Sequence, residues 1–327
     1  MILWTRDPVQ AERIATARHN VRYLAGVPIP DGVLVTADLD RAAACPALII
    51  AAPAEGVPGL RDRLAPLLHP EHLLLSATKG LAPGDGRRMS ELWAEALPAA
   101  RIAALSGPNI SREIAAGLPA PTVIASADPG TAKRFQSLVG TPMFRVYTNE
   151  DIVGVELCGA LKNVIALGAG AIDRIGYGGN AKAGFMTRGL AEIARFAFAQ
   201  GANPLTPAGL AGIGDLITTC TSAHSRNRMV GELLAAGLDR AAIAARLGGQ
   251  VAEGIGTTAA VVAAARAQGI AMPIAEATHR VLFAGLPVRD AMRALMDREP
   301  GEEIAGPLAE VSRMLAGLSA AAAKHPR

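Results

Sequence analysis

The sequence contains few of the residues from which disulfides and metal sites are built. Its three cysteines, Cys45, Cys158 and Cys220, are odd in number and far apart, which favours a reducing compartment over a disulfide scaffold. The six histidines are scattered, and His69 and His72, which come closest to a pair, flank a turn that contains proline. We therefore predict no metal site.

The sequence also has no large excess of basic or acidic residues, and it has few aromatic residues. The 32 basic and 29 acidic residues are spread along the chain, so the sequence lacks the basic surface of a protein that binds nucleic acid or a membrane surface. Half of the residues are hydrophobic but only 3% are aromatic, and the excess is mostly alanine, which suits closely packed helices. A charged residue that matters is therefore expected to act locally, in a site.

The sequence also gives little indication of export or membrane insertion. No basic and then apolar leader precedes the first apolar run, so we expect a cytoplasmic protein. Residues 152–172 are about long enough to span a bilayer, but Glu156, Lys162 and Asn163 lie among them with nothing to offset their cost in lipid. We predict that this segment is the buried central helix of a soluble domain.

Length and hydrophobic pattern predict two domains, residues 1–149 and 150–327, because the chain is too long for one ordinary core. In the first part, short apolar runs alternate with amphipathic segments, which predicts an α/β domain with an open parallel sheet of the Rossmann type. The expected strands are 2–4, 33–36, 47–52, 73–78, 102–105, 122–125 and 144–147. The expected helices include 8–19, 56–68, 88–97 and 129–139.

The second part is expected to be all helical, because the strand signal disappears after about residue 150 and helical periodicity replaces it. In doubly wound sheets, ligands lie beyond the carboxyl ends of the strands, where a following helical domain can close over them. We therefore expect strand-end residues and polar residues of the helical part to form one shared site. The alanine-rich segment 319–325 is expected to be a fraying helix end.

Two strand ends carry candidate site residues. Lys79 and Gly80 follow the fourth run, which places an ammonium group where a phosphate or carbonyl could be held; a solvated loop lysine is the alternative. Gly107 and Pro108 follow the fifth run. The glycine allows close approach of the backbone, and the proline suits the first turn of a helix whose free N–H groups could bind an anion, with a simple capped turn as the alternative.

Lys162 and Asn163 lie inside a strongly apolar helical segment. Burial disfavours the charged ammonium group and can lower the pKa of Lys162 toward neutrality, which makes it a usable acid or base. A snorkelling lysine is the alternative, although the apolar run continues for two turns on both sides. Residues 168–173 begin like a Gly-x-Gly-x-x-Gly motif but follow a helix and lack the third glycine, so we expect these small residues to let two helices approach closely.

Three further polar groups come from the helical part. Asp215 opens an apolar run that reads like a helix, and it could be only a cap. Residues 225–228, Ser-Arg-Asn-Arg, offer a guanidinium fork and an amide that suit a phosphate, with a solvated basic helix start as the alternative. Glu253 precedes another helix start, and its meaning is unclear in isolation.

Taken in this order, these segments resemble the NAD(P)-dependent glycerol-3-phosphate dehydrogenases of the bacterial type, from residue 2 to about 310. The matching segments are 3–8 (LWTRDP), 77–81 (ATKGL), 105–108 (LSGP), 144–149 (FRVYTN), 153–157 (VGVEL), 160–164 (ALKNV), 214–216 (GDL), 225–228 (SRNR) and 250–254 (QVAEG). The resemblance implies an all-helical second domain of the 6-phosphogluconate-dehydrogenase-like type. It also implies a homodimer and a reversible hydride transfer between NAD(P)H and dihydroxyacetone phosphate, which gives sn-glycerol 3-phosphate for phospholipid synthesis.

The resemblance assigns roles to individual residues. Lys162 would exchange the proton at the reacting oxygen, Lys79 would polarise the carbonyl, and Asp215 and Asn163 would orient the substrate and Lys162. The substrate phosphate would be held by Gly107, Asn109, Ser225, Arg226 and Asn227. The cofactor would contact Arg6, Lys79, Ser111, Arg226, Val251 and Glu253. An arginine at position 6 can accommodate a 2′-phosphate, which favours NADP over NAD.

The sequence departs from the family pattern in two places. Asn109, Ile110 and Ser111 stand where such proteins usually carry Ser or Thr, an aromatic residue and Ala, so we expect altered contacts there. The family also begins with a strand, a Gly-x-Gly-x-x-Gly turn and a helix, and its second strand corresponds to residues 2–6. We expect that Met1 is an internal methionine and that the natural protein begins about 25 residues earlier, judged from the size of such a unit.

The absent unit has structural consequences. Its turn would cradle the cofactor pyrophosphate and its strand would lie in the centre of the sheet, so we expect a gap in the sheet, lower stability and weak NAD(P) binding. Two other functions stay open: a related two-domain reductase that acts on a hydroxy acid, and a non-catalytic remnant that binds a substrate or a partner.

Overall fold

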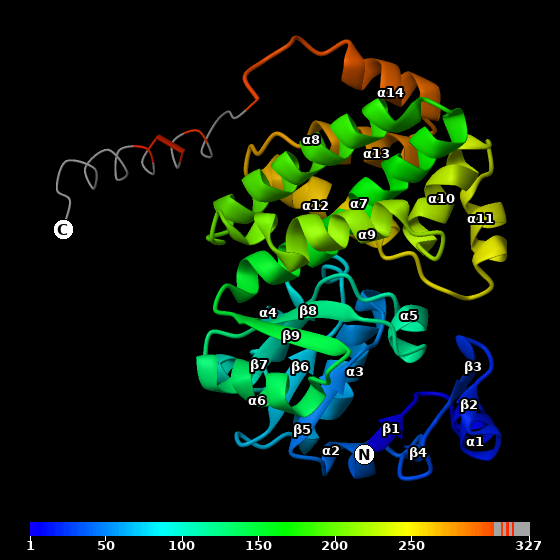
Figure 1. Ribbon diagram of the computed structural model, residues 1–327, viewed down its shortest axis with the longest axis vertical. Helices are drawn as coiled ribbons and strands as arrows, with labels where there is room; N and C mark the ends of the chain where they lie inside the picture. The colour runs from blue at the N-terminus through cyan, green and yellow to red at the C-terminus, as the bar shows by residue number, and fades with distance from the viewer. Residues whose placement is uncertain (304–308, 310–311, 314–315, 317–327) are drawn as a thin grey trace.

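The computed structural model describes residues 1–303, 309, 312–313 and 316 (Figure 1). The helix end expected at residues 319–325 lies outside the described residues. A sheet with its helices forms one end of the molecule and helices alone form the other, which confirms the predicted α/β region and the helical region that follows it. The long helix α7 (Ile152–Ile175) begins directly after the last strand and leads from one region into the other.

The main sheet has five strands in the order β5-β6-β7-β8-β9. Their bounds are Ala47–Ile50, Leu73–Ser76, Ile102–Ser106, Ala120–Ala125 and Phe144–Asn149. Successive residues of β6 point to opposite faces: Leu74 packs with Trp93 and Leu64, whereas Leu75 packs with Phe135. Both faces of the sheet are therefore covered, which explains why the strands read as continuous apolar runs.

One pair of strands differs from the predicted parallel sheet. β7 and β8 run antiparallel, with Leu105 opposite Ile124, while the other three pairs of the main sheet are parallel. The connection between them contains only the short helix α5 (Ser111–Ala115), about 7.5 Å long at 1.5 Å per residue. This helix is too short to return the chain to the opposite end of the sheet, so β8 enters from the end where β7 finishes.

A second, two-stranded sheet stands apart from the main one. It pairs β1 (Ile2–Trp4) with β4 (Leu34–Thr36) in parallel, and neither strand is bonded to β5. The break in the sheet is thus found where the gap is expected. An antiparallel hairpin of β2 (His19–Asn20) and β3 (Leu24–Pro28), which the sequence pattern did not indicate, precedes β4.

The remaining helices follow the predicted pattern with shifted ends. They are α1 Pro8–Ala17, α2 Leu39–Ala43, α3 Val57–Leu64, α4 Met89–Trp93, α6 Pro129–Val139, α8 Gly178–Ala199, α9 Asp215–Thr221, α10 Arg226–Ala235, α11 Arg240–Leu247, α12 Gly254–Ala267, α13 Pro273–Phe283 and α14 Val288–Met296. α4 is shorter than the predicted helix 88–97. Pro98 disfavours helical backbone at Leu97, and the chain after Trp93 forms turns.

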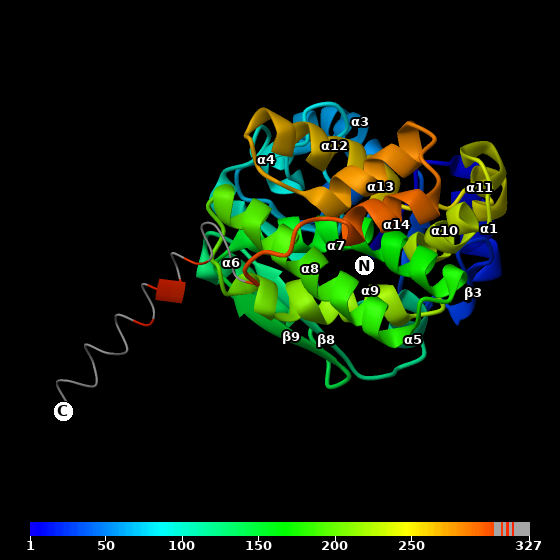
Figure 2. The same cartoon turned by 90° about the horizontal axis from the view of Figure 1, so that it is seen from above.

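Helix α7 is the centre of the helical region and contacts α8, α9, α10, α12 and α13 (Figure 2). It is the one described helix that is long and apolar enough to cross a membrane, but 83% of its most apolar window is buried inside the protein. This burial is the pattern of a core helix, as predicted.

Glycines allow α7 and α10 to pack with their backbones in contact. A Cβ atom on Gly170 would lie 1.9 Å from the carbonyl oxygen of Arg228, and one on Gly231 would lie 1.8 Å from that of Leu167. Neither position can carry a larger residue without moving a helix. The small residues of segment 168–173 therefore serve close helix packing, as predicted.

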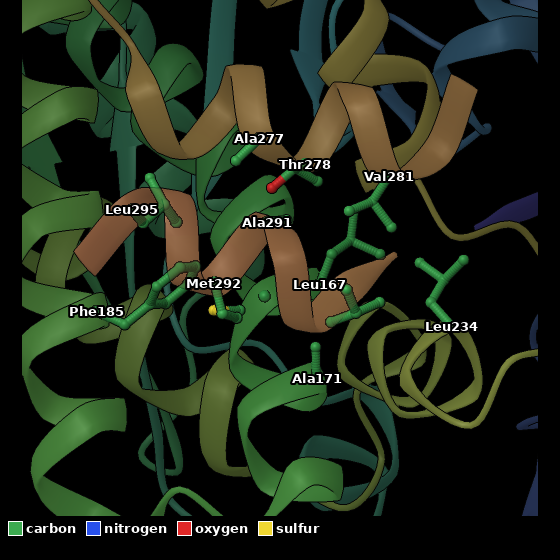
Figure 3. A pocket seen from close by; sticks show the side chains of 12 residues that line it. Leu167, Ala171, Phe185, Leu234, Ala277, Thr278, Val281, Ala291, Met292 and Leu295 are labelled. Atoms are coloured by element: carbon green, nitrogen blue, oxygen red, sulfur yellow. The ribbon is translucent and has the colours of Figure 1, made fainter. Parts of the chain in front are cut away.

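An apolar cavity of about 30 Å³ lies beneath α14 (Figure 3). Leu167 of α7, Phe185 of α8 and Met292 of α14 are among the side chains that line it. The one polar side chain of the lining is Thr278, and its hydroxyl donates a hydrogen bond to the carbonyl oxygen of Ile274. We interpret the cavity as a packing gap, because it offers no free polar group to a substrate.

Candidate active site

Two lysines from distant parts of the sequence meet at one buried carboxylate. Lys79 Nζ lies 2.7 Å from Oδ2 of Asp215, and Lys162 Nζ lies 3.0 Å from Oδ1 of the same residue. Lys79 also donates to the carbonyl oxygen of Gly107 at 2.7 Å. The ends of β6 and β7 and helices α7 and α9 therefore converge on one point, as expected for a site beyond the carboxyl ends of the strands.

The local structure explains how each charged group reaches this point. Lys79 follows β6, and Lys162 lies in the middle of α7, where it is only 6% exposed. Asp215 is the first residue of α9, directly after a π-helical turn, Leu210–Gly214. Such turns shift the side chains that follow them and are frequent at functional sites. Asp215 is 1% exposed, so it is not a solvent-facing helix cap.

Burial and charge set the protonation of the pair. Burial lowers the pKa of Lys162 to about 8, and repulsion from Lys79 acts in the same direction, while Asp215 opposes both. Burial alone would raise the pKa of Asp215, but the ammonium groups of Lys162 and Lys79 outweigh it and hold that pKa below its usual value. A lysine with a pKa near neutrality beside a charged carboxylate can both donate and accept a proton.

A threonine that the sequence reasoning missed completes this group. The hydroxyl of Thr219 accepts a hydrogen bond from Lys162 Nζ and lies 3.3 Å from Oδ1 of Asp215. Asp215 and Thr219 are four residues apart on α9, so they share a face of the helix. That spacing within an apolar run was the available signal.

A chain of amides ties the lysines to the helical region. Asn163 Nδ2 donates to the carbonyl oxygen of Lys79 at 3.4 Å, and Asn227 Nδ2 donates to Oδ1 of Asn163 at 2.9 Å. Oδ1 of Asn227 in turn accepts from the backbone N–H of Gly254 at 2.9 Å. A Cβ atom at position 254 would lie 2.6 Å from the carbonyl oxygen of Asn163, so this contact requires glycine.

The basic segment 225–228 divides into two parts with different environments. Ser225 caps α10 by accepting from the N–H of Arg228 at 3.2 Å. The guanidinium group of Arg228 is paired with Asp173 at 2.7 Å and with Glu232 at 2.8 Å. Arg226 is exposed and makes no ion pair within the described part of the chain. The guanidinium left for an anion is thus that of Arg226 and not that of Arg228.

The turn after β7 is shaped by Gly107, whose φ of +131° is unfavourable for other residues. A side chain there would also meet Thr122, because a Cβ atom would lie 3.2 Å from its Cα atom. Asn109 Nδ2 donates to the hydroxyl of Thr122 at 3.0 Å, while its buried Oδ1 finds no partner among the described residues. Asn109 thus stabilises the turn through its hydrogen bond to Thr122.

The predicted cofactor residues fall into two groups. Glu253 lies where the sheet and helical regions meet: its Oε1 accepts from the N–H of Ala54 at 3.2 Å. Burial raises the pKa of Glu253, and the hydrogen bond from Ala54 and the attraction of Arg226 only partly offset this. Val251 is half-buried in the same segment. Arg6 and Ser111 are exposed, and no side-chain hydrogen bond joins either to the lysines.

Other reactive groups do not contribute to a metal or thiol site. Burial raises the pKa of Cys158 and of Cys220 to about 12, so both thiols stay protonated. His72 is buried and its Nε2 lies 2.9 Å from the carbonyl oxygen of Ala43. Across the described residues, no group of three or more His, Cys, Asp or Glu side chains is placed to hold a metal ion.

Comparisons with known proteins agree along the chain. Residues 1–132 match the family model described as NAD-dependent glycerol-3-phosphate dehydrogenase N-terminus, and residues 151–293 match the model of its C-terminus. Glycerol-3-phosphate dehydrogenase (NAD(P)+) of Chlorobium limicola is 43% identical over 306 residues, 92% of each chain. That of a Parafrankia species is 45% identical over 304 residues, 92% of this chain and 91% of the relative.

Solved structures give the same result. The crystal structure of glycerol-3-phosphate dehydrogenase from Coxiella burnetii superposes with a TM-score of 0.86 at 34% identity and covers 91% of both chains. Both halves of the sequence, its relatives and its fold thus point to one family. The chain belongs to the NAD-dependent glycerol-3-phosphate dehydrogenases.

Proposed function

We propose that this protein catalyses the reversible reduction of dihydroxyacetone phosphate to sn-glycerol 3-phosphate with NAD(P)H, for glycerophospholipid synthesis. The observation that carries the proposal is the buried carboxylate of Asp215 with an ammonium group on each oxygen. A ketone that is reduced needs a proton and stabilisation of a developing alkoxide, and two cations supply both. The family membership supports the same reaction.

Lys162 is the residue that exchanges the proton. Its pKa of about 8 means that the protonated form dominates at neutral pH and that the neutral form is accessible for the reverse reaction. Two of its N–H bonds donate to Asp215 and Thr219, which fixes the direction of the one that remains. Lys79 stays beside it as a second cation that polarises the carbonyl.

The phosphate of the substrate is held between the start of α10 and the turn after β7. Arg226 supplies a guanidinium group that has no ion-pair partner in the described residues, and Asn227, Ser225, Gly107 and Asn109 complete the set. Asn163 orients Lys162 and the substrate through its bond to Asn227. Binding energy from the phosphate then positions the carbonyl, which does not itself bind strongly.

NAD(P)H supplies the hydride when it is bound. The residues present fit a cofactor, because the hydroxyl of Thr257 is buried without a described partner beside Gly80 and Glu253 and would be free to bind it. The proposed contacts are Arg6, Lys79, Ser111, Arg226, Val251 and Glu253. The exposed Arg6 at the end of β1 favours NADP. A glycine-rich turn for the pyrophosphate is not among the described residues.

We propose two domains, residues 1–149 and 150–327, since β9 ends at Asn149 and α7 begins at Ile152. We further propose a soluble cytoplasmic enzyme that works as a homodimer on a small phosphorylated substrate, without nucleic acid or membrane partners. Light scattering coupled to size-exclusion chromatography would measure the oligomeric state.

The test of the function is NADPH oxidation with dihydroxyacetone phosphate against a panel of 2-keto acids. We expect oxidation with the phosphorylated ketone alone, because the keto acids lack the group that Arg226 binds. Faster oxidation with a keto acid would assign the protein to hydroxy-acid reduction. Binding of glycerol 3-phosphate without any turnover would identify a non-catalytic substrate-binding protein.

A further inference from the structure

Glu156 is a buried acid outside the group formed by Lys79, Lys162 and Asp215. It lies in the second turn of α7 with 9% of its surface exposed. Its Oε1 accepts from the backbone N–H of Ser90 at 2.8 Å, and its Oε2 accepts from the hydroxyl of Ser90 and from Arg88 Nη1 at 2.9 Å. Both partners belong to the start of α4, in the sheet region, so the contact joins the two regions.

The two ends of this contact lead directly to the two catalytic lysines. Glu156 precedes Lys162 by six residues on the same helix, about 9 Å along its axis at 1.5 Å per residue. Arg88 follows Lys79 by nine residues, through a compact turn in which the N–H of Ala82 bonds to the carbonyl oxygen of Arg87 at 2.8 Å. Each lysine is therefore connected to the contact by a short, hydrogen-bonded segment.

The segment between Lys79 and Arg88 packs into two of the protein's hydrophobic cores. Leu81, 4% exposed, packs in the core around α7, and the next residue, Ala82, 1% exposed, packs in the core between the sheet and α4. The segment is thus attached at one end through Lys79 to Asp215 and at the other through Arg88 and Ser90 to Glu156. With both ends attached, it cannot shift relative to α7 unless one attachment breaks.

The free-energy cost of burying the carboxylate of Glu156 suggests that it serves to position neighbouring elements. Burial raises the pKa of Glu156, and Arg88 and Ser90 only partly offset this. Because desolvation of a buried ion pair can equal or exceed its attraction, such a pair is weak evidence for stability and is better explained by a need for a defined geometry. Here the geometry defined is that of α7 against the segment that carries Lys79.

We propose that Glu156, through Arg88 and Ser90, is a positioning residue that sets the distance between Lys79 and Lys162. This inference rests on the proposed function, in which the two lysines act on one substrate carbonyl. Glu156 does not touch the reacting atoms and acts only through the placement of α7.

The test compares E156Q with E192Q. Glu192 is also buried, at 3% exposure, and accepts from the N–H groups of Ile274 and Ala275 at the start of α13, so it stabilises a helix within the helical region alone. Both variants replace one buried carboxyl group by an amide of nearly the same shape. If E156Q does not fold, S90A takes its place; it removes the hydroxyl that donates to Glu156 and accepts from Arg88.

The first measurement is the titration of Lys162 by NMR of protein labelled with ¹³C-lysine, which is feasible because the chain has five lysines. The groups that face Lys162 are Asp215, Lys79 and the thiol of Cys220. If the segment shifts, water enters and Lys79 moves away, so the pKa of Lys162 should rise from about 8 in E156Q and stay unchanged in E192Q. An unchanged value in E156Q, or an equal rise in E192Q, would overturn the proposal.

The second measurement is the split between kcat and KM for dihydroxyacetone phosphate. E156Q should lower kcat by at least about tenfold, because misplacement of a reacting group by about 1 Å can cost on the order of 100-fold, while KM changes little. E192Q should lower the melting temperature without this loss. Absence of turnover in the wild-type protein would refute the proposed function, and the Lys162 titration would still decide the role of Glu156.

Discussion

Lys162 Nζ lies 3.0 Å from Oδ1 of Asp215, and both side chains are almost fully buried. The two residues are 53 positions apart and come from helices α7 and α9. Because the same carboxylate also balances Lys79, a change in Asp215 or Lys79 alters the pKa of Lys162. The predictions on catalysis follow from this coupling.

Replacement of Lys162 by methionine should abolish proton transfer without unfolding the protein. We expect kcat/KM to fall by about 10²–10⁴-fold, the usual contribution of a general acid. The melting temperature should not fall, because Asp215 keeps Lys79 as its partner and a desolvated ammonium group is removed. The matched control is K182M, which breaks an ion pair with Asp173 and should leave the rate unchanged. A K162M protein with wild-type rate would exclude Lys162 as the acid.

The pH dependence of the rate should report the lowered pKa of Lys162. Reduction needs its protonated form, so kcat/KM for dihydroxyacetone phosphate should fall as the pH rises above about 8. Oxidation of glycerol 3-phosphate needs the neutral form and should rise up to the same pH. Initial rates in both directions check this, and a descending limb near the ordinary lysine value of about 10.4 would contradict it.

The variant D215N should shift the pH at which kcat/KM falls and should lower the free energy of unfolding. Without the carboxylate, the repulsion from Lys79 and the burial act unopposed, so the pKa of Lys162 should fall further and the descending limb should shift to lower pH. The free energy of unfolding should drop by about 3–5 kcal/mol, as expected when one partner of a buried ion pair is removed. Denaturant titration measures it, with the exposed Asp290→Asn as the control. A limb that stays in place would show that Asp215 does not set the protonation of Lys162.

Substitutions of the two arginines of segment 225–228 should have different effects, one on substrate binding and the other on stability. R226Q should raise KM for dihydroxyacetone phosphate by about 10–100-fold, because a hydrogen bond to a charged group is worth about 1.5–3 kcal/mol. Its melting temperature should not change. R228Q should lower the melting temperature, because it breaks the pairs with Asp173 and Glu232. Unphosphorylated dihydroxyacetone is the control substrate: if R226Q slows it equally, Arg226 does not bind the phosphate.

Local sequence predicted the elements well where capping and apolar pattern agree. The helix predicted at 129–139 is found as α6 with the same bounds, because Asp128 caps it and Pro129 suits its first turn. The convergence of Lys79 and Lys162 was also predictable, since both the strand-end rule and the buried position pointed to one site. These features depend on residues that are close in sequence or on the general topology of the sheet.

Features that depend on distant contacts were not predictable from the pattern. In the hairpin of β2 and β3, one strand has only two residues and the other, Leu24–Pro28, contains a glycine and ends in a proline, so the apolar pattern of a strand is absent. The pairing of Arg228 with Asp173 joins α10 to the end of α7, and nothing near position 228 indicates it. The direction of β8 depends on how far a short connection can carry the chain. In each case tertiary geometry decided between arrangements that the local sequence permits equally.

The close contact of α7 with α10 predicts that one substitution should affect both the stability of the protein and its binding of the phosphorylated substrate. A Cβ atom on Gly231 would lie 1.8 Å from the carbonyl oxygen of Leu167, so G231A must push the helices apart and should cost about 1–3 kcal/mol or more. The matched control is G184A, at a helical position with open space around it, which should gain roughly 0.5–1 kcal/mol from the lower flexibility of the unfolded chain.

Because α10 begins at Arg226, its displacement by G231A should also raise KM for the phosphorylated substrate while G184A leaves KM unchanged. Chemical denaturation and initial-rate kinetics on the same two variants measure both effects. If G231A is as stable as the wild type, the two helices are not held in backbone contact, and the position of Arg226 must then depend on its own turn and not on the packing of α10 against α7.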